Sequence, residues 1–229
     1  MMMPENGHRA HGFSSAFFLD SDEIIQELNL TGDETIMDAG CGDGHNAIKI
    51  LEDYNHKGTV YAVDIYDASI EDMEKYKSEN NVENLINIEA DITDGIPGVD
   101  DESIDVVLLV NVFHGFKASR KLDEAVDELA RIVKEDGKIA IMDYKAWDVP
   151  KGPPTQMRSS PEELERLFKD HGLKMNYLNE EIGEDIPEGK SHYLIMFEKE
   201  WLFSIESLKL SKLFFENYYI LFFKDYNLR

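Results

Sequence analysis

The sequence has few of the features that mark a secreted or membrane-spanning protein. Its 229 residues include a single cysteine, Cys41, so one chain cannot form an internal disulfide. Residues 1–15 contain no apolar stretch that could serve as a secretory signal. No window reaches about 18 uncharged apolar residues, the length that a membrane-spanning helix needs. These absences predict a soluble, cytoplasmic protein without a membrane span.

Basic residues are also scarce. Lys and Arg number 23 against 47 Asp and Glu, which gives a formal net charge of -24 at pH 7. Contacts from Lys and Arg to phosphates supply most nucleic-acid affinity, so we expect no nucleic-acid partner. The acidity itself is typical of a well-solvated surface.

Apolar runs alternate with amphipathic stretches, a pattern typical of a mostly parallel sheet covered by helices. Strands are expected at 35–40, 58–65, 85–91, 104–112, 137–143, 173–178 and 191–199. Helices are expected at 22–30, about 46–53, 67–80, 119–133 and from Pro161 onward, the first capped by Asp20 or Ser21 and the last by Ser160. The sequence therefore predicts a single α/β domain of Rossmann-like type, with a seven-stranded, mostly parallel sheet and helices on both faces.

The two ends of the chain differ from its middle. We expect residues 1–19 to form a flexible N-terminal segment that could act as a lid, and residues 20–199 to form the main domain. Residues 200–229 are rich in Phe, Tyr, Leu and Lys and have lost the acidic excess. We expect them to form an apolar, aromatic helical appendage that packs on this chain or joins a second copy in a homodimer.

A glycine-rich bend follows the first predicted strand. Residues 38–44 read Asp-Ala-Gly-Cys-Gly-Asp-Gly, and glycine lets the backbone approach a ligand closely. The dinucleotide fingerprint G-x-G-x-x-G would need a third glycine where His45 stands. Asp43 would also place negative charge where a pyrophosphate must lie. A nicotinamide-dependent oxidoreductase is therefore the less favoured alternative.

With this bend, and with Asp64 and Asp91 at the ends of the next two strands, the sequence from about residue 13 to 199 resembles the class I S-adenosylmethionine-dependent methyltransferases. The resemblance implies that Asp64 holds the ribose hydroxyls, Asp91 meets the adenine amine and Asp38 lies near the ligand's ammonium group. Carboxylates accept strong hydrogen bonds from such donors, although a strand-terminal Asp is also a common helix cap. The expected cofactor-binding residues are Asp38, Gly40, Cys41, Gly42, Gly44, Asp64, Ile65, Asp91, Ile92 and Asn111. Cys41 is expected to be a small packing residue of the bend.

The segment after the fourth predicted strand should face the transferred methyl group. His114 is a possible catalytic base because its unperturbed pKa is near neutrality, and the alternative is a structural or solvent-facing histidine. The long loop 144–160 is expected to cover the substrate. In it Trp147 could form an aromatic wall, and Arg158 could clamp an anion or neutralise neighbouring acids. Tyr144 could orient the substrate or merely pack, and we predict no metal site.

The methyl acceptor is less well defined by the sequence. The chain lacks the N-P-P-Y or D-P-P-Y motif of enzymes that methylate adenine or glutamine amides, and its single cysteine counts against arsenic methylation. The nearer resemblance is to small-molecule methyltransferases of the quinone-biosynthesis type. We therefore expect a methyltransferase that acts on a small-molecule acceptor. The alternative outside enzymology is a catalytically inactive cofactor-binding protein that serves a protein partner.

Overall fold

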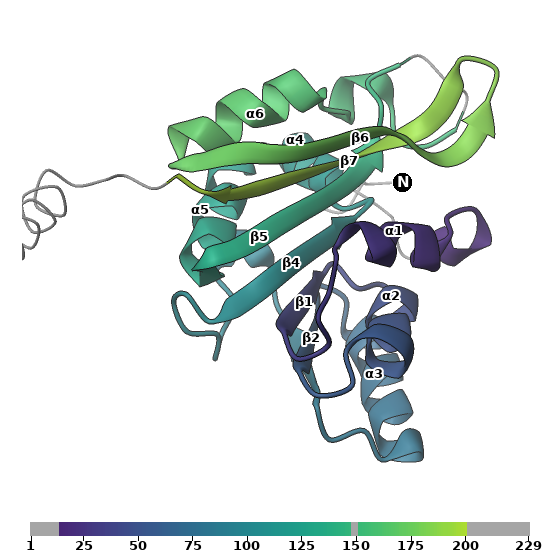
Figure 1. The fold of residues 1–229 in the computed structure, drawn as a ribbon, viewed down its shortest axis with the longest axis vertical. Coiled ribbons are helices and arrows are strands. Elements are labelled where there is room, and N and C mark those ends of the chain that lie inside the picture. Colours follow the sequence, from purple (N-terminus) through teal and green to yellow (C-terminus); the bar gives the residue numbers. More distant parts are fainter. Residues whose placement is uncertain (1–13, 148–150, 201–229) are drawn as a thin grey trace, which may run out of the picture. The chain divides into compact units, whose positions relative to one another are not determined.

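The described residues contain one sheet with the strand order β3-β2-β1-β4-β5-β7-β6 (Figure 1). The structure is a computed structural model, and it describes residues 14–147 and 151–200. The strands are β1 Thr35–Ala39, β2 Thr59–Asp64, β3 Leu85–Glu89, β4 Ile104–Val110, β5 Val133–Tyr144, β6 Leu173–Ile186 and β7 Gly189–Lys199. Strands β1 to β5 are parallel, and β7 is antiparallel to both of its neighbours. The predicted seven-stranded, mostly parallel sheet is confirmed.

Helices cover both faces of this sheet (Figure 1). The α-helices are α1 Ser21–Glu27, α2 His45–Lys49, α3 Asp67–Asn80, α4 Phe113–Ser119, α5 Leu122–Ile132 and α6 Pro161–Asp170. Short helices of other types are η1 Ser15–Phe17, η2 Ile50–Tyr54, η3 Ile92–Asp94 and η4 Thr155–Met157. Asp20 caps α1, and Ser160 forms a capping box with Glu163 at the start of α6, as the sequence predicts.

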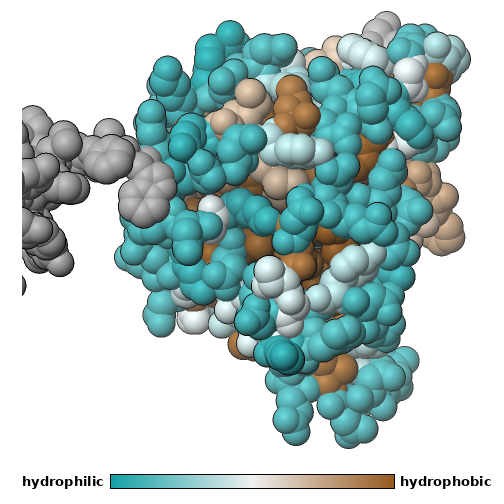
Figure 2. All heavy atoms as spheres, in the orientation of Figure 1, coloured by the Kyte–Doolittle hydropathy of each residue, from teal (hydrophilic) through white to brown (hydrophobic). Residues whose placement is uncertain are grey.

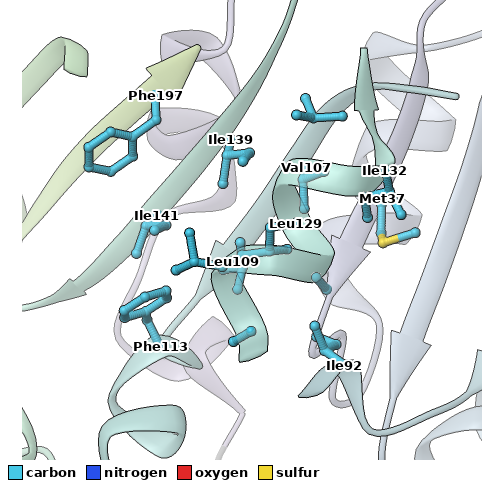
Figure 3. Close-up of a cluster of buried hydrophobic side chains, with 14 of the residues drawn as sticks. Met37, Ile92, Val107, Leu109, Phe113, Leu129, Ile132, Ile139, Ile141 and Phe197 are labelled. Atoms are coloured by element: carbon cyan, nitrogen blue, oxygen red, sulfur yellow. The ribbon is translucent and has the colours of Figure 1, made fainter. Parts of the chain in front are cut away.

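Strand β4 separates the two halves of the core. Val107 and Leu109 pack with helices α4, α5 and α6 in the cluster of Figure 3, whereas Val106 and Leu108 pack with α1, α2 and α3 on the opposite face. Alternate residues of a strand point to opposite faces, so a strand that is apolar throughout must be covered on both sides. The continuous apolar run of β4 therefore fixes its place in the middle of the sheet.

Several element boundaries differ from those expected, and backbone conformation explains two of them. The helix expected at 119–133 is α5, which begins only at Leu122 because Arg120 adopts a left-handed conformation with φ 63°. Arg120 also ends α4, Phe113–Ser119, a helix that was not expected from the sequence. The strand expected at 104–112 ends at Val110, because Asn111 has φ 58°. Strand β5 begins at Val133 rather than 137, and β6 continues to Ile186 rather than 178. These shifts leave the order of the elements unchanged.

Some expectations fall outside the described residues. They concern residues 1–13 of the segment 1–19 expected to be a flexible lid, residues 148–150 of the loop, and residues 201–229 of the helical appendage expected at 200–229. In the described part of the chain, no helix has the length and apolar character to cross a membrane. The face shown in Figure 2 is covered mainly by hydrophilic residues, with smaller hydrophobic areas between them.

Candidate active site

The carboxyl ends of five neighbouring parallel strands place the predicted site residues along one edge of the sheet. Following the order β3-β2-β1-β4-β5, the residues at or just after these ends are Asp91, Asp64, Asp38, Asn111 and Tyr144. Ligands of open α/β sheets bind at this edge, where the strand order reverses. The reversal lies here between β1 and β4. The topology therefore brings together residues that are up to about a hundred positions apart in the sequence.

The glycine bend occupies the first strand end. Gly40, Gly42 and Gly44 all have positive φ, at 80°, 56° and 77°. A Cβ atom on Gly44 would lie 1.9 Å from Sδ of Met73, so this glycine is needed for packing. A Cβ atom on Gly42 would meet no atom of the described residues within 4 Å. Gly42 therefore borders open space, as a backbone that must approach a ligand should.

Asp64 connects the second strand to this bend. Its Oδ2 accepts a hydrogen bond of 2.8 Å from the backbone N–H of Gly42, and its Oδ1 accepts one of 3.0 Å from that of Tyr66. Two backbone donors thus fix the orientation of a buried carboxylate at the end of β2. Ile65, which follows Asp64 in the sequence, is 43% exposed.

Asp38 is buried beneath the bend. Its Oδ2 accepts a hydrogen bond of 3.1 Å from the N–H of Ala47 in α2. Burial raises the pKa of Asp38 to about 7, and the nearby charges of Asp64 and Asp43 add to this effect, against the opposing charge of His45. An acid with such a pKa is half protonated near neutrality, and a cation beside it would favour its ionised form.

Asp91 acts as a helix cap in this structure. Its Oδ1 accepts hydrogen bonds from the backbone N–H and the hydroxyl of Thr93, and its Oδ2 lies 3.5 Å from Nζ of Lys121. Burial opposes ionisation, but these hydrogen bonds and the lysine charge lower the pKa of Asp91 below its usual value. Ile92 and Cys41 are buried in the core, and burial raises the pKa of the Cys41 thiol, as suits a packing residue.

At the ends of β4 and β5, His114 and Asp143 form a buried pair. The Nδ1 atom of His114 lies 3.0 Å from Oδ1 of Asp143, and the backbone N–H of His114 donates to Oδ2 over 2.9 Å. The N–H of Tyr144 also donates to Oδ1, over 2.7 Å. Burial opposes ionisation, yet the charge and hydrogen bonds of His114 bring the pKa of Asp143 below its usual value. The sequence interpretation included His114 but missed Asp143, whose only signal is its place at a strand end.

His192 of β7 is a second residue that the sequence interpretation missed. Its Nε2 lies 3.1 Å from Oδ1 of Asn111, and its Nδ1 lies 2.6 Å from Oγ of Ser191. Its ring centroid is 4.0 Å from that of Tyr144. Burial, aided by the charges of Arg158, His114 and Lys145 and opposed by Asp143, lowers the pKa of His192 to about 4. A neutral imidazole therefore supports Asn111 and Tyr144 at neutral pH.

Arg158 is buried within the loop after β5. Its guanidinium donates hydrogen bonds to the backbone carbonyls of Lys145, Trp147, Lys151 and Pro153, at 2.6 to 3.2 Å. It also lies 5.3 Å from the centroid of the Tyr144 ring. These contacts hold the loop against the end of β5. Among the described residues, no group of acidic, histidine or cysteine side chains has the arrangement of a metal site.

The fold and the glycine bend define a class I methyltransferase of Rossmann-like type. The chain matches the family described as "Methyltransferase domain" over residues 30–200, and it belongs to that family. Membership in this family confirms the predicted class of enzyme, a methyltransferase domain.

Known proteins are similar to this chain in sequence or in structure. The tRNA(Thr) (cytosine(32)-N(3))-methyltransferase of Saccharomyces cerevisiae is 29% identical over 157 residues, 64% of this chain and 24% of that protein. The uncharacterized methyltransferase YcgJ of Bacillus subtilis is 27% identical over 127 residues, 56% of this chain and 47% of that protein. The chain thus spans less than half the length of either relative. The crystal structure of a SAM-dependent methyltransferase from Aquifex aeolicus matches with a TM-score of 0.68 and 22% sequence identity. The match covers 82% of this chain and 93% of the Aquifex aeolicus chain.

Proposed function

We propose that this methyltransferase acts on a small-molecule acceptor and that His114 accepts the proton which the acceptor loses. The observation that carries the proposal is the buried pair of His114 and Asp143, at the ends of β4 and β5 and on the same sheet edge as the glycine bend. A histidine oriented by a buried carboxylate is a common arrangement for a general base.

The cofactor half of the site is formed by the bend and by the ends of β1, β2 and β3. In the proposal Asp64 receives the ribose hydroxyls, Asp38 lies near the ammonium group and Asp91 lies near the adenine amine. Gly40, Gly42 and Gly44 shape the backbone beside the methionine part, with Asn111 on its other side. The open space at Gly42 and the buried carboxyl of Asp38 support this assignment, because the first leaves room for a ligand and a cationic group beside the second would stabilise its ionised form.

The acceptor half is formed by residues of α4 and β5. Asp143 accepts the hydrogen of Nδ1, which leaves Nε2 of His114 as the nitrogen that receives a proton. When bound, S-adenosylmethionine supplies a methyl group whose bond to sulfur breaks, with the electron pair staying on sulfur. Nε2 of His114 would receive the proton that the acceptor loses as it bonds to the methyl carbon. Tyr144 and Trp147 border this half of the site, and the contacts of Arg158 hold the covering loop in place.

A tRNA acceptor is the second candidate, because the yeast relative and two vertebrate relatives are named as tRNA methyltransferases. Two observations favour the small molecule. The chain carries twice as many acidic as basic residues, 47 against 23, which opposes binding to a phosphate backbone. It also spans only 24% of the yeast protein.

The experiment measures transfer from labelled S-adenosylmethionine to a fractionated extract of small metabolites and, in parallel, to total tRNA. We expect label in a small-molecule fraction with the natural chain and a strong loss with His114→Gln. His171→Gln is the matched control. His171 pairs with two exposed carboxylates, those of Asp123 and Asp127, and neither carboxylate is assigned to the site. Label in tRNA alone would establish the second candidate. Cofactor binding without transfer to either pool would indicate a catalytically inactive cofactor-binding protein.

A further inference from the structure

We propose that Lys145 forms a binding subsite for an anionic group, a carboxylate or a phosphate, on the methyl acceptor. The inference rests on the proposed function, because it assigns a substrate class to that site. Lys145 directly follows Tyr144, the last residue of β5, and its backbone N–H donates to the carbonyl of Ser191 over 3.0 Å. The pairing of β5 with β7 thus fixes where this lysine emerges from the sheet edge.

The environment of the Lys145 ammonium group is unusual. Only 5% of the residue is exposed. Among the described residues, its Nζ forms no ion pair and donates no hydrogen bond, and its one recorded contact is with the Trp147 ring, 4.3 Å from Nζ to the centroid. The Nζ atom itself retains some access to solvent, so a ligand can reach it. The cation–π contact with Trp147 contributes only about 0.5–2 kcal/mol. An anionic ligand at this position would complete the site.

Several other lysines of the described chain have an acidic partner. Lys117 pairs with Glu163 at 2.9 Å, and Lys151 in the same loop pairs with Glu184 at 2.8 Å. Acidic residues outnumber basic ones by 47 to 23, so a lysine without a carboxylate partner is not explained by a shortage of carboxylates. In the folded chain, none of the described carboxylates forms an ion pair with Lys145.

The position of Lys145 ties it to the acceptor half of the site. It lies two residues after Asp143, which binds His114, and its charge is one of those that lower the pKa of His192. The nearby guanidinium of Arg158 donates to backbone carbonyls, including that of Lys145 itself. Lys145 is therefore the cation at this edge that the protein's own hydrogen bonds leave available. Trp147, 37% exposed, adds an aromatic surface beside it.

The test uses the fluorescence of Trp147 as a reporter of the ammonium group above it. The sequence contains two tryptophans, so Trp201→Phe in the full chain leaves Trp147 as the single one. Acetate and phosphate are titrated separately at constant ionic strength, with chloride as the reference anion. We expect a saturable change in Trp147 fluorescence with at least one of the two probes and none with chloride. The probe that binds more tightly distinguishes a carboxylate from a phosphate.

Three variants are then compared in the Trp201→Phe background. Lys145→Met should weaken the anion response by at least about tenfold, the loss expected from one charge-assisted contact. Lys151→Met is the matched control and should respond normally, because that lysine is 67% exposed and already paired. If Lys145→Met fails to melt cooperatively, Lys145→Gln takes its place. An absent response in the parent chain, or an equal response after either Lys145 substitution, would overturn the subsite. Since no methyl transfer is measured, a failure here is distinguishable from a failure of the proposed function.

Discussion

Asp143 binds His114 twice, through the imidazole Nδ1 at 3.0 Å and through the backbone N–H at 2.9 Å. One carboxylate thus fixes both the ring and the first turn of α4 that carries it. Because both residues are buried, removal of the carboxylate would leave three donors without their acceptor: these two and the backbone N–H of Tyr144. The pair therefore has a structural and a chemical role that different substitutions can separate.

We expect His114→Gln to lower turnover by roughly a hundredfold or more, the usual contribution of a general base, while cofactor affinity stays within about threefold. Asp143→Asn should lower turnover less and should also lower the melting temperature, because its amide can replace only part of the acceptor capacity. Steady-state kinetics and calorimetric titration with S-adenosylmethionine measure the two effects. Normal turnover in His114→Gln would assign the pair a purely structural role.

The strand ends that form the cofactor half could be predicted because a parallel sheet aligns them automatically. An apolar run that ends in Asp38 or Asp64 indicates both the strand and the edge to which the carboxylate belongs. The helix caps at Asp20 and Ser160 depend on neighbouring residues only, and they too were predicted correctly.

Contacts between distant residues could not be predicted in this way. His192 meets Asn111 across 81 positions of sequence, and this contact exists only because β7 inserts antiparallel beside β5. Asp143 has no pattern that links it to His114. The left-handed conformation of Arg120 separates the unexpected helix α4 from α5, and no glycine at that position signals it in the sequence.

The second prediction concerns the carboxylate that orders the glycine bend. Asp64→Ala should weaken binding of S-adenosylmethionine by roughly 1.5–3 kcal/mol, about tenfold to 150-fold, through loss of charge-assisted hydrogen bonds. Calorimetric titration measures the affinity, and a thermal melt verifies the fold. Asp67→Asn, at the exposed start of α3, is the control and should bind normally. Unchanged affinity in Asp64→Ala would remove the ribose assignment.

The third prediction follows from the raised pKa of Asp38, about 7. At pH below 7 the acid is mostly protonated and must lose its proton to pair with a cationic ligand, so cofactor affinity should rise by up to about tenfold between pH 6 and 8. The contribution of Asp38 to the stability of the folded protein changes with pH in the opposite direction to the cofactor affinity. It is fully present below the unfolded pKa of 3.8 and is lost as the pH rises through about 7.

Asp38→Asn should remove both the pH dependence of cofactor affinity and the pH dependence of stability. Calorimetric titrations at the two pH values, in buffers of different ionisation enthalpy, measure the affinity and the number of protons released. Persistence of the same pH dependence in Asp38→Asn would show that another group is responsible.

The fourth prediction concerns the end of the catalytic sheet. Strand β7 ends at Lys199, after pairing with β5 and β6, so the sheet is complete at that residue. We expect a chain that ends at Lys199 to melt cooperatively and to bind S-adenosylmethionine, with any loss confined to solubility or self-association. Ultracentrifugation and calorimetry measure these properties. A truncated chain that melts cooperatively but no longer binds the cofactor would make residues 200–229 part of the site.

The last prediction compares two glycines of the bend that have similar backbone conformations but different surroundings. Gly42 and Gly44 both have positive φ, so alanine at either position carries roughly 1–2 kcal/mol of backbone strain. Gly44→Ala adds a clash with Met73 and should lower the melting temperature much more than Gly42→Ala does. The added methyl group of Gly42→Ala meets no atom of the described residues and instead enters the space that we assign to the cofactor. It should therefore weaken S-adenosylmethionine binding by at least about tenfold, while the apo protein loses only the stability that corresponds to the backbone strain. Thermal melts and calorimetric titrations of both variants measure these effects. If Gly42→Ala binds the cofactor normally, the ligand does not approach the backbone at this turn, and the open space there has another cause.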